Sequence, residues 1–194
     1  MTATHPVQHR RLAGRRRDRG LTIIELTVVL IVLGVIVALG VIPAMGGMTA
    51  RQRVQGVQAE LLVDLQLARS EQAQRSGEST KVSVTFGSNG DVTCYTIHTV
   101  GSAACDCTRA AGTACAGVAD AQEIKTRQLE RAIGVSIAAS SPVVFEPPKG
   151  LVTPVGVVIA VQSATRGQLR TTLSGTGVPT VCSPDGSIPG VNPC

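Results

Sequence analysis

The hydrophobic and polar positions divide the chain into three parts. Residues 1–20 are polar and basic, residues 21–42 form a nearly unbroken apolar run, and residues 43–194 mix apolar and polar positions. Glu25 carries the only formal charge within the apolar run. About 20 consecutive apolar residues are enough for a helix to cross the ~30 Å hydrocarbon core of a bilayer. The pattern therefore predicts a transmembrane helix over residues 21–42.

Helical periodicity resumes after a weak point over residues 43–47, where a proline and two glycines lower the helix propensity. Between residues 49 and 76 the apolar side chains recur at steps of three and four, while charged residues such as Asp64 fall largely on other faces. The apolar stripe comprises Val54, Val57, Leu61, Leu62, Leu65 and Ala68. We expect residues 43–76 to form the soluble half of a long spine helix, with this stripe packed on a globular domain.

The pattern changes to short β-rich segments over residues 77–194. Alternating or β-branched runs, separated by glycine and proline turns, predict strands at 81–86, 91–100, 123–129, 134–138, 143–145, 155–161, 168–173 and 178–182. Residues 101–121 are rich in alanine, glycine and cysteine without a period, and we expect them to form a long loop. A long helix followed by many short strands predicts an α+β protein with antiparallel β-sheets.

The charge is concentrated in the first part of the chain. Of the 18 lysines and arginines, six lie in residues 1–20, and of the 13 acidic residues only Asp18 does. Positive charge before a membrane span keeps that end in the cytoplasm, so we expect the C-terminal domain to lie outside the inner membrane. The remaining residues carry 12 charges of each sign. A neutral remainder gives no compositional reason to expect nucleic-acid binding.

Glu25 needs a partner if its surroundings are apolar. A carboxylate at the centre of a membrane span costs on the order of 2.5 to 3.5 kcal/mol, and less near its boundary. Cleavage after Gly20 would create an α-amino group on Leu21 at the same depth as Glu25. Within one helix these groups are poorly placed to pair, but in an assembly the amine of one subunit can meet the carboxylate of the next.

Two simpler interpretations compete with this one. An ordinary secretory signal has a shorter apolar core followed by small residues, as in 37–40, but here the core is long and contains Glu25. A plain signal anchor would make that acid accidental. Neither interpretation explains the order Gly-Leu-Thr-Ile-Ile-Glu over residues 20–25.

That order resembles the N-terminal signal of type IV pilins and type II secretion pseudopilins. The match covers Gly20, Thr22, Glu25 and the apolar run, whereas Leu21 replaces the usual phenylalanine. The resemblance implies that residues 1–20 are a leader, removed by a prepilin peptidase that also methylates the amine of Leu21. It implies that Glu25 and Thr22 act in assembly.

Later segments resemble the GspH/FimT group of minor pseudopilins. They are 67–71 at the end of the predicted helix, 145–150 with its Pro-Pro-Lys-Gly turn, and the closing segment 181–194. The resemblance implies a spine helix against two small antiparallel sheets. It implies a minor pseudopilin of a Gram-negative type II secretion system, with a transmembrane helix at 21–42 and a periplasmic domain at 77–194.

All six cysteines follow the apolar run, and an even number outside the cytoplasm fits disulfide bonds. We expect Cys182 to pair with Cys194. The pairing of the other four stays open: Cys94, Cys105, Cys107 and Cys115. A metal site made from these four is an alternative, but no C-x-x-C spacing supports it. A lone His98 on a strand is more often a packed or surface residue than a ligand.

We expect no enzymatic activity and no cofactor, because the chain lacks a nucleophile elbow, a phosphate-binding loop, an H-E-x-x-H motif and a dinucleotide fingerprint. The expected partners are other pseudopilins, the prepilin peptidase and inner-membrane lipid. The alternative function is that of a minor type IV pilin in pilus biogenesis or DNA uptake.

The DNA-uptake members of the GspH/FimT group carry a Gly-Arg-x-Arg stretch before the first C-terminal cysteine. Here the matching residues 177–182 contain no arginine. Arg166 and Arg170 lie nearby, but two arginines without an aromatic platform are a weak signal for nucleic acid. We therefore expect no direct binding of DNA.

Overall fold

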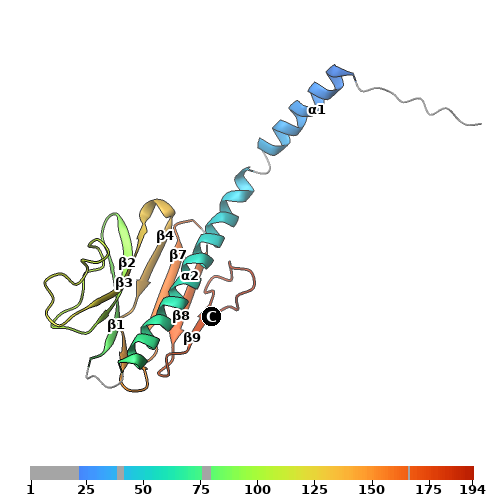
Figure 1. Cartoon of the computed structure of the whole chain (residues 1–194). Coiled ribbons are helices and arrows are strands. Elements are labelled where there is room, and N and C mark those ends of the chain that lie inside the picture. Colours follow the sequence, from blue (N-terminus) through green and yellow to red (C-terminus); the bar gives the residue numbers. More distant parts are fainter. Residues whose placement is uncertain (1–21, 39–41, 76–79, 166) are drawn as a thin grey trace, which may run out of the picture. The chain divides into compact units, whose positions relative to one another are not determined.

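The computed structural model describes residues 22–38, 42–75, 80–165 and 167–194 (Figure 1). They divide into two compact units, one within residues 1–42 and the other within residues 43–194. The first unit contains helix α1 (Ile23–Ile36). The second contains nearly all of helix α2 (Ile42–Gln74) and all the strands.

The prediction of a long transmembrane spine helix is wrong. The described residues contain two α-helices, and α1 has 14 residues, which at about 1.5 Å per residue span about 21 Å. Among the described residues, no helix combines the length and the apolar character that crossing a bilayer requires. The predicted single-pass location in the inner membrane, with a periplasmic C-terminal domain, depended on that helix. The same finding shows that this prediction is wrong.

Helix α2 begins earlier than the periodicity indicated. It includes Pro43 and both glycines of residues 43–47, which we expected to form a weak point. Proline is tolerated in the first turn of a helix because its missing N–H has no intrahelical partner there. The apolar stripe packs as expected at Val54, Leu61, Leu65 and Ala68, which are all buried.

The strands form two antiparallel sheets. The first has the order β3-β2-β1-β5-β6 and the second β4-β7-β8-β9. Their bounds are β1 Val82–Ser88, β2 Val92–Thr99, β3 Glu123–Glu130, β4 Val135–Ala139, β5 Val143–Glu146, β6 Leu151–Thr153, β7 Val158–Ser163, β8 Gln168–Leu173 and β9 Pro179–Cys182. Eight of the nine coincide with expected strands. The exception is β6, which is too short to show an alternating pattern.

The hydrophobic core lies between α2 and both sheets. Figure 1 shows α2 running across the strands of the second unit. The core joins residues of α2 to residues of both sheets, including Tyr95 and Phe145 from the first sheet and Ile159 and Leu169 from the second. Valine, isoleucine and leucine supply most of the remaining core side chains.

Strand β2 is buried on both of its faces. Tyr95 and Ile97 belong to the core shared with α2, whereas Cys94, Thr96 and His98 alternate with them and are also buried. The loop of residues 100–122 covers this second face, where the Thr85 hydroxyl donates to the Cys105 carbonyl. A loop without secondary structure thus serves as the outer layer of the first sheet.

Candidate functional site

Helix α1 begins at Ile23, directly after Thr22 of the Gly-Leu-Thr-Ile-Ile-Glu segment. Thr22 is extended (φ −74°, ψ 151°), and its Oγ1 accepts a hydrogen bond from the Glu25 backbone N–H at 3.3 Å. Threonine is a preferred N-cap because its oxygen pairs an N–H that the helix leaves without a partner. The Glu25 carboxylate lies in the first turn, where the helix dipole favours negative charge. Thr22 and Glu25 therefore have a local role in starting the helix.

The surface of α1 is apolar all the way round. Eleven of its 14 residues are large apolar side chains, and none of its residues is buried. They are Ile23, Ile24, Leu26, Val28, Val29, Leu30, Ile31, Val32, Leu33, Val35 and Ile36. Exposed apolar surface this continuous marks an interaction surface.

Glu25 is the single charge on α1. Within the described part of the chain, no lysine, arginine or histidine pairs with its carboxylate. Gly20 and Leu21, the expected cleavage and methylation site, lie outside the described residues. The expected pairing of Glu25 with a Leu21 amine therefore stays a prediction.

Three buried polar side chains of α2 fasten the helix to the strands. The Gln58 amide donates to Thr171 Oγ1 on β8 at 2.5 Å, and the Gln72 oxygen accepts from the Val82 N–H at the start of β1 at 2.6 Å. Asp64, between them, contacts β2 and β3. Because the partners belong to both sheets, these bonds set the position of α2 along them.

Asp64 is the charged side chain among the three anchors. Its carboxylate is 3% exposed and accepts from the Tyr95 hydroxyl at 2.6 Å and from Lys125 Nζ at 2.7 Å. Burial, followed by the hydrogen bond to Asp64, raises the pKa of Tyr95 above its ordinary value. Asp64 is an exception to the expectation that the charged residues of this helix fall largely on faces other than the apolar stripe, because it is buried against the strands.

The structure contains three disulfide bonds, and no described cysteine is free. Cys182 pairs with Cys194, which is the pair expected from the sequence. Cys94 pairs with Cys107, and Cys105 pairs with Cys115. The four cysteines that were also considered as a metal site are thus bonded to each other in pairs.

Glu123 holds the part of the loop that carries Cys115. Its carboxylate accepts hydrogen bonds from the Gly112 N–H at 2.7 Å, the Ala114 N–H at 2.8 Å and the Thr126 hydroxyl at 2.6 Å. Partial burial opposes ionisation, but these bonds outweigh it and lower the pKa of Glu123. The loop is therefore ordered by a charged group of β3 as well as by disulfides.

His98 lies beneath this loop and is buried. Its Nδ1 is 2.8 Å from the Thr99 carbonyl, which can only accept, so Nδ1 carries the proton. Burial is the dominant cause that lowers the pKa of His98, which leaves the imidazole neutral at pH 7. Of the two alternatives expected for His98, a packed or a surface residue, the structure shows the packed one.

The two arginines considered for nucleic acid do not form a described site. Arg166 lies outside the described residues. Arg170 lies on β8, where it alternates with the buried residues Leu169 and Thr171 and is half-buried. No described aromatic ring stacks near it, since the one described ring pair is Phe86 with Tyr95.

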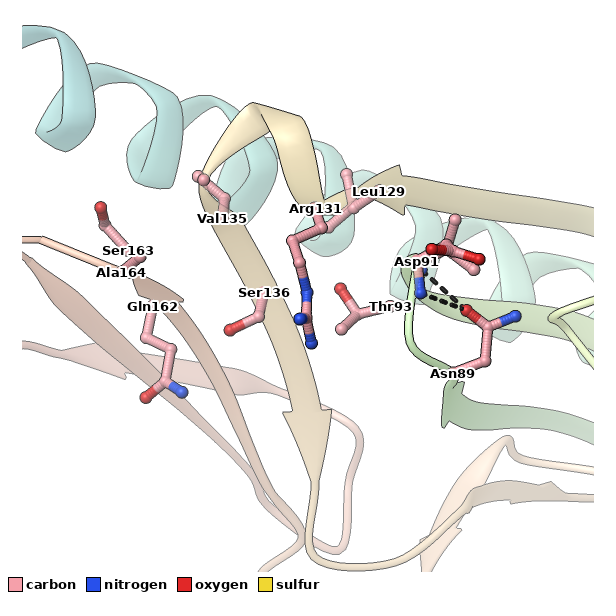
Figure 2. Close-up of a pocket in the computed structure, with 12 residues that line it drawn as sticks. Asn89, Asp91, Thr93, Leu129, Arg131, Val135, Ser136, Gln162, Ser163 and Ala164 are labelled. Carbon is pink, nitrogen blue, oxygen red and sulfur yellow. Dashed lines mark hydrogen bonds between the residues drawn. The ribbon is translucent and has the colours of Figure 1, made fainter.

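A cleft of about 230 Å³ opens between the ends of the two sheets (Figure 2). Residues of β2, β3, β4 and β7 line it, and Figure 2 shows the Arg131 side chain lying between Ser136 and Thr93. The Asn89 side chain at its edge accepts from the Asp91 and Val92 N–H groups. Its lining includes neither histidine nor cysteine. The cleft offers hydrogen-bonding groups, including the hydroxyls of Thr93 and Ser136 and the guanidinium of Arg131.

Comparisons with protein-family models, with curated proteins and with solved structures gave no match to this chain. The family resemblance seen in the sequence therefore rests on the motif residues alone.

Proposed function

We propose that the chain is a minor pseudopilin, a non-enzymatic structural subunit of a type II secretion pseudopilus that serves protein export across the outer membrane. The observation that carries the proposal is helix α1, a capped helix with apolar side chains on every side and one carboxylate in its first turn. The motif over residues 20–26 agrees with it.

The chemistry of α1 favours other copies of the same kind of helix as its cover. Burying one valine, leucine or isoleucine side chain contributes about 1.5 to 3 kcal/mol. A bundle of such helices would bury the apolar surface on all sides, which a partner contacting one face would not do. The subunits of a helical filament offer that arrangement.

Glu25 would set the position of each subunit in the bundle. We propose that a prepilin peptidase cuts after Gly20 and methylates Leu21, and that the Leu21 amine of one subunit pairs with Glu25 of the next. A buried ion pair adds little net stability, but a misplaced subunit would leave both charges unpaired in apolar surroundings. The pair would therefore favour one axial position over all others.

The second unit is suited to an oxidising compartment. Its three disulfides cross-link the 101–121 loop and the C-terminal tail, and such bonds persist outside the reducing cytoplasm. They support a role of this unit as the exposed part of a filament subunit.

Deleting the gene tests the proposal. We expect specific secreted proteins to be retained by the cell while surface pili remain, and a plasmid copy of the gene to restore release. Mass spectrometry of the medium and electron microscopy of pili make the comparison. Normal secretion together with lost pili would contradict the pseudopilus and favour a minor type IV pilin.

Glu25→Val should keep the subunit out of the filament. The change adds apolar surface, so α1 should still associate, but no carboxylate remains to select the axial position. We expect incorporation, measured by co-purification with the filament, to fall at least about tenfold, which corresponds to about 1.4 kcal/mol.

Thr27→Val is the matched control for this variant. Thr27 lies on the same helix, and its hydroxyl donates to the Ile24 carbonyl within that helix. The nearly isosteric valine should be incorporated like the wild type. Equal incorporation of Glu25→Val and Thr27→Val would remove the pairing from the proposal.

A further inference from the structure

His98 has a buried nitrogen without a partner. The residue is 2% exposed and is the last but one residue of β2, beside an irregularity in the pairing of β2 with β3 between Ile97 and His98. Nδ1 donates to the Thr99 carbonyl, so the lone pair of the neutral ring is on Nε2. Nε2 is buried, and no hydrogen-bond partner for it exists among the described residues. A buried unpaired polar atom in a folded protein calls for a specific explanation, such as an ion or a redox role.

Two sulfur atoms lie near the imidazole of His98. The potential ligand atoms of His98, Cys105 and Cys115 all lie within 4.8 Å of one another. In the described residues, they form the one group of three or more histidine, cysteine and acidic side chains with this closeness. The two cysteines are bonded to each other, so neither sulfur is a thiolate that could bind a metal in this oxidised form.

We propose that reduction of the Cys105–Cys115 disulfide converts this cluster into a zinc site, with His98 Nε2 and the two thiolates as ligands. A dithiol reductant supplies two electrons and two protons, so the S–S bond breaks, two thiols form, and the reductant becomes a disulfide. Zn²⁺ then replaces the two thiol protons, which leave to solvent. The inference is independent of the proposed function in filament assembly.

The donor set suits this ion. Two thiolates and one imidazole are ligands that zinc accepts in tetrahedral sites, and a set of three protein ligands leaves a fourth position for water. The hydrogen bond from Nδ1 to the Thr99 carbonyl supports the site. When one ring nitrogen of a histidine binds a metal, the N–H of the other ring nitrogen usually donates to such a carbonyl, and this bond orients the imidazole.

Access to the cluster is available at Cys115. This residue borders a surface hollow of about 620 Å³, which Gly112, Glu123 and Thr126 also line. Cys105 and Cys115 are 5% and 9% exposed, compared with 0% for Cys94 of the neighbouring disulfide. A reductant and an ion therefore reach Cys115 more readily than they reach Cys94, and no histidine joins the Cys94–Cys107 pair in the described structure.

Titration of the full-length chain in detergent with Zn²⁺ tests the proposal. A phosphine reductant breaks the disulfides without adding sulfur ligands, because the phosphine becomes a phosphine oxide with oxygen from water. We expect the oxidised chain to bind no zinc and the reduced chain to bind one ion tightly. Cobalt(II) in the same site should show thiolate charge-transfer absorption, and X-ray absorption should report two sulfur ligands with at least one nitrogen.

Three variants identify the ligands. His98→Asn can place its amide N–H near the Thr99 carbonyl but has no equivalent of Nε2, and we expect at least about tenfold weaker zinc binding. Cys105→Ser with Cys115→Ser should abolish binding, whereas Cys94→Ser with Cys107→Ser should leave it unchanged.

The proposal would be overturned by any of three results: no stoichiometric zinc in the reduced wild type, unchanged affinity in His98→Asn, or loss of binding only when Cys94 and Cys107 are replaced. Circular dichroism of each oxidised variant checks its fold. If His98→Asn does not fold, the ligands counted by X-ray absorption on the wild type decide, and a site of sulfur ligands without nitrogen would refute the assignment.

Discussion

Replacing Asp64 by alanine is expected to lower the free energy of unfolding of the second unit by about 3 kcal/mol, because removing one partner of a buried, hydrogen-bonded charge pair leaves the others unsatisfied. The Tyr95 hydroxyl would lose its acceptor while it stays buried, and Lys125 would lose its anion. Urea unfolding of the oxidised full-length chain in detergent, followed by circular dichroism, measures the change.

Glu60→Ala is the matched control on the same helix. Glu60 also pairs with a cation of β3, since its Oε1 is 2.8 Å from Arg127 Nε, but both side chains are about one-third exposed. Exposed ion pairs contribute about 0 to 1 kcal/mol, so this variant should lose no more than that.

A double-mutant cycle separates the buried hydrogen bond from other effects. Combining Asp64→Ala with Tyr95→Phe removes the hydroxyl together with its acceptor, so the double variant should be more stable than the sum of the two single changes implies. Strictly additive changes, or equal losses for Asp64→Ala and Glu60→Ala, would show that Asp64 is not a buried anchor.

Leu61→Ala is expected to lower the free energy of unfolding by about as much as Asp64→Ala, through lost apolar packing in place of a lost polar contact. Leu61 is fully buried on α2 between the anchors Gln58 and Asp64, within the core that joins this helix to both sheets. Truncating a buried leucine removes apolar contacts and leaves a cavity, which costs about 3 kcal/mol or more. The same unfolding experiment should show this loss.

Val63→Ala provides the comparison for Leu61. Val63 lies two residues further along α2 and is 63% exposed, so its truncation should change the stability by no more than about 0.5 kcal/mol. Similar losses of stability for the two variants would mean that α2 does not pack on the sheets through the face that carries Leu61.

The apolar pattern predicted the local elements well and the extent of the first helix poorly. The stripe through Leu61 and Leu65 named the packed face of α2, and alternation found every strand except β6. Residues 21–42 have a uniform composition that carries no internal boundary, so the division into α1 and a separate α2 could not be derived from it. The predicted transmembrane span was wrong for that reason.

The assembly role of Thr22 and Glu25 stays a prediction from the sequence, and what the structure shows is the hydrogen bond between them at the start of α1. Thr22 and Glu25 are three residues apart, and that spacing is sufficient for the cap that starts α1. The role of Asp64 could not be found this way, because its partners Tyr95 and Lys125 are 31 and 61 residues away. Helical spacing says which residues share a face, but it does not show that a charge on that face meets a cation and a hydroxyl.

By itself, the sequence determined the apolar helix, its single carboxylate, the β-rich second unit and the number of cysteines, because each depends on near neighbours or on composition. Tertiary structure alone decided how the four cysteines other than Cys182 and Cys194 pair, and it brought His98 close to the Cys105–Cys115 bond. The physical reason is that a disulfide or a ligand cluster requires atoms a few ångströms apart in space. Several pairings satisfy the same spacing along the chain, and the packing of the 101–121 loop on β1 and β2 selects one of them.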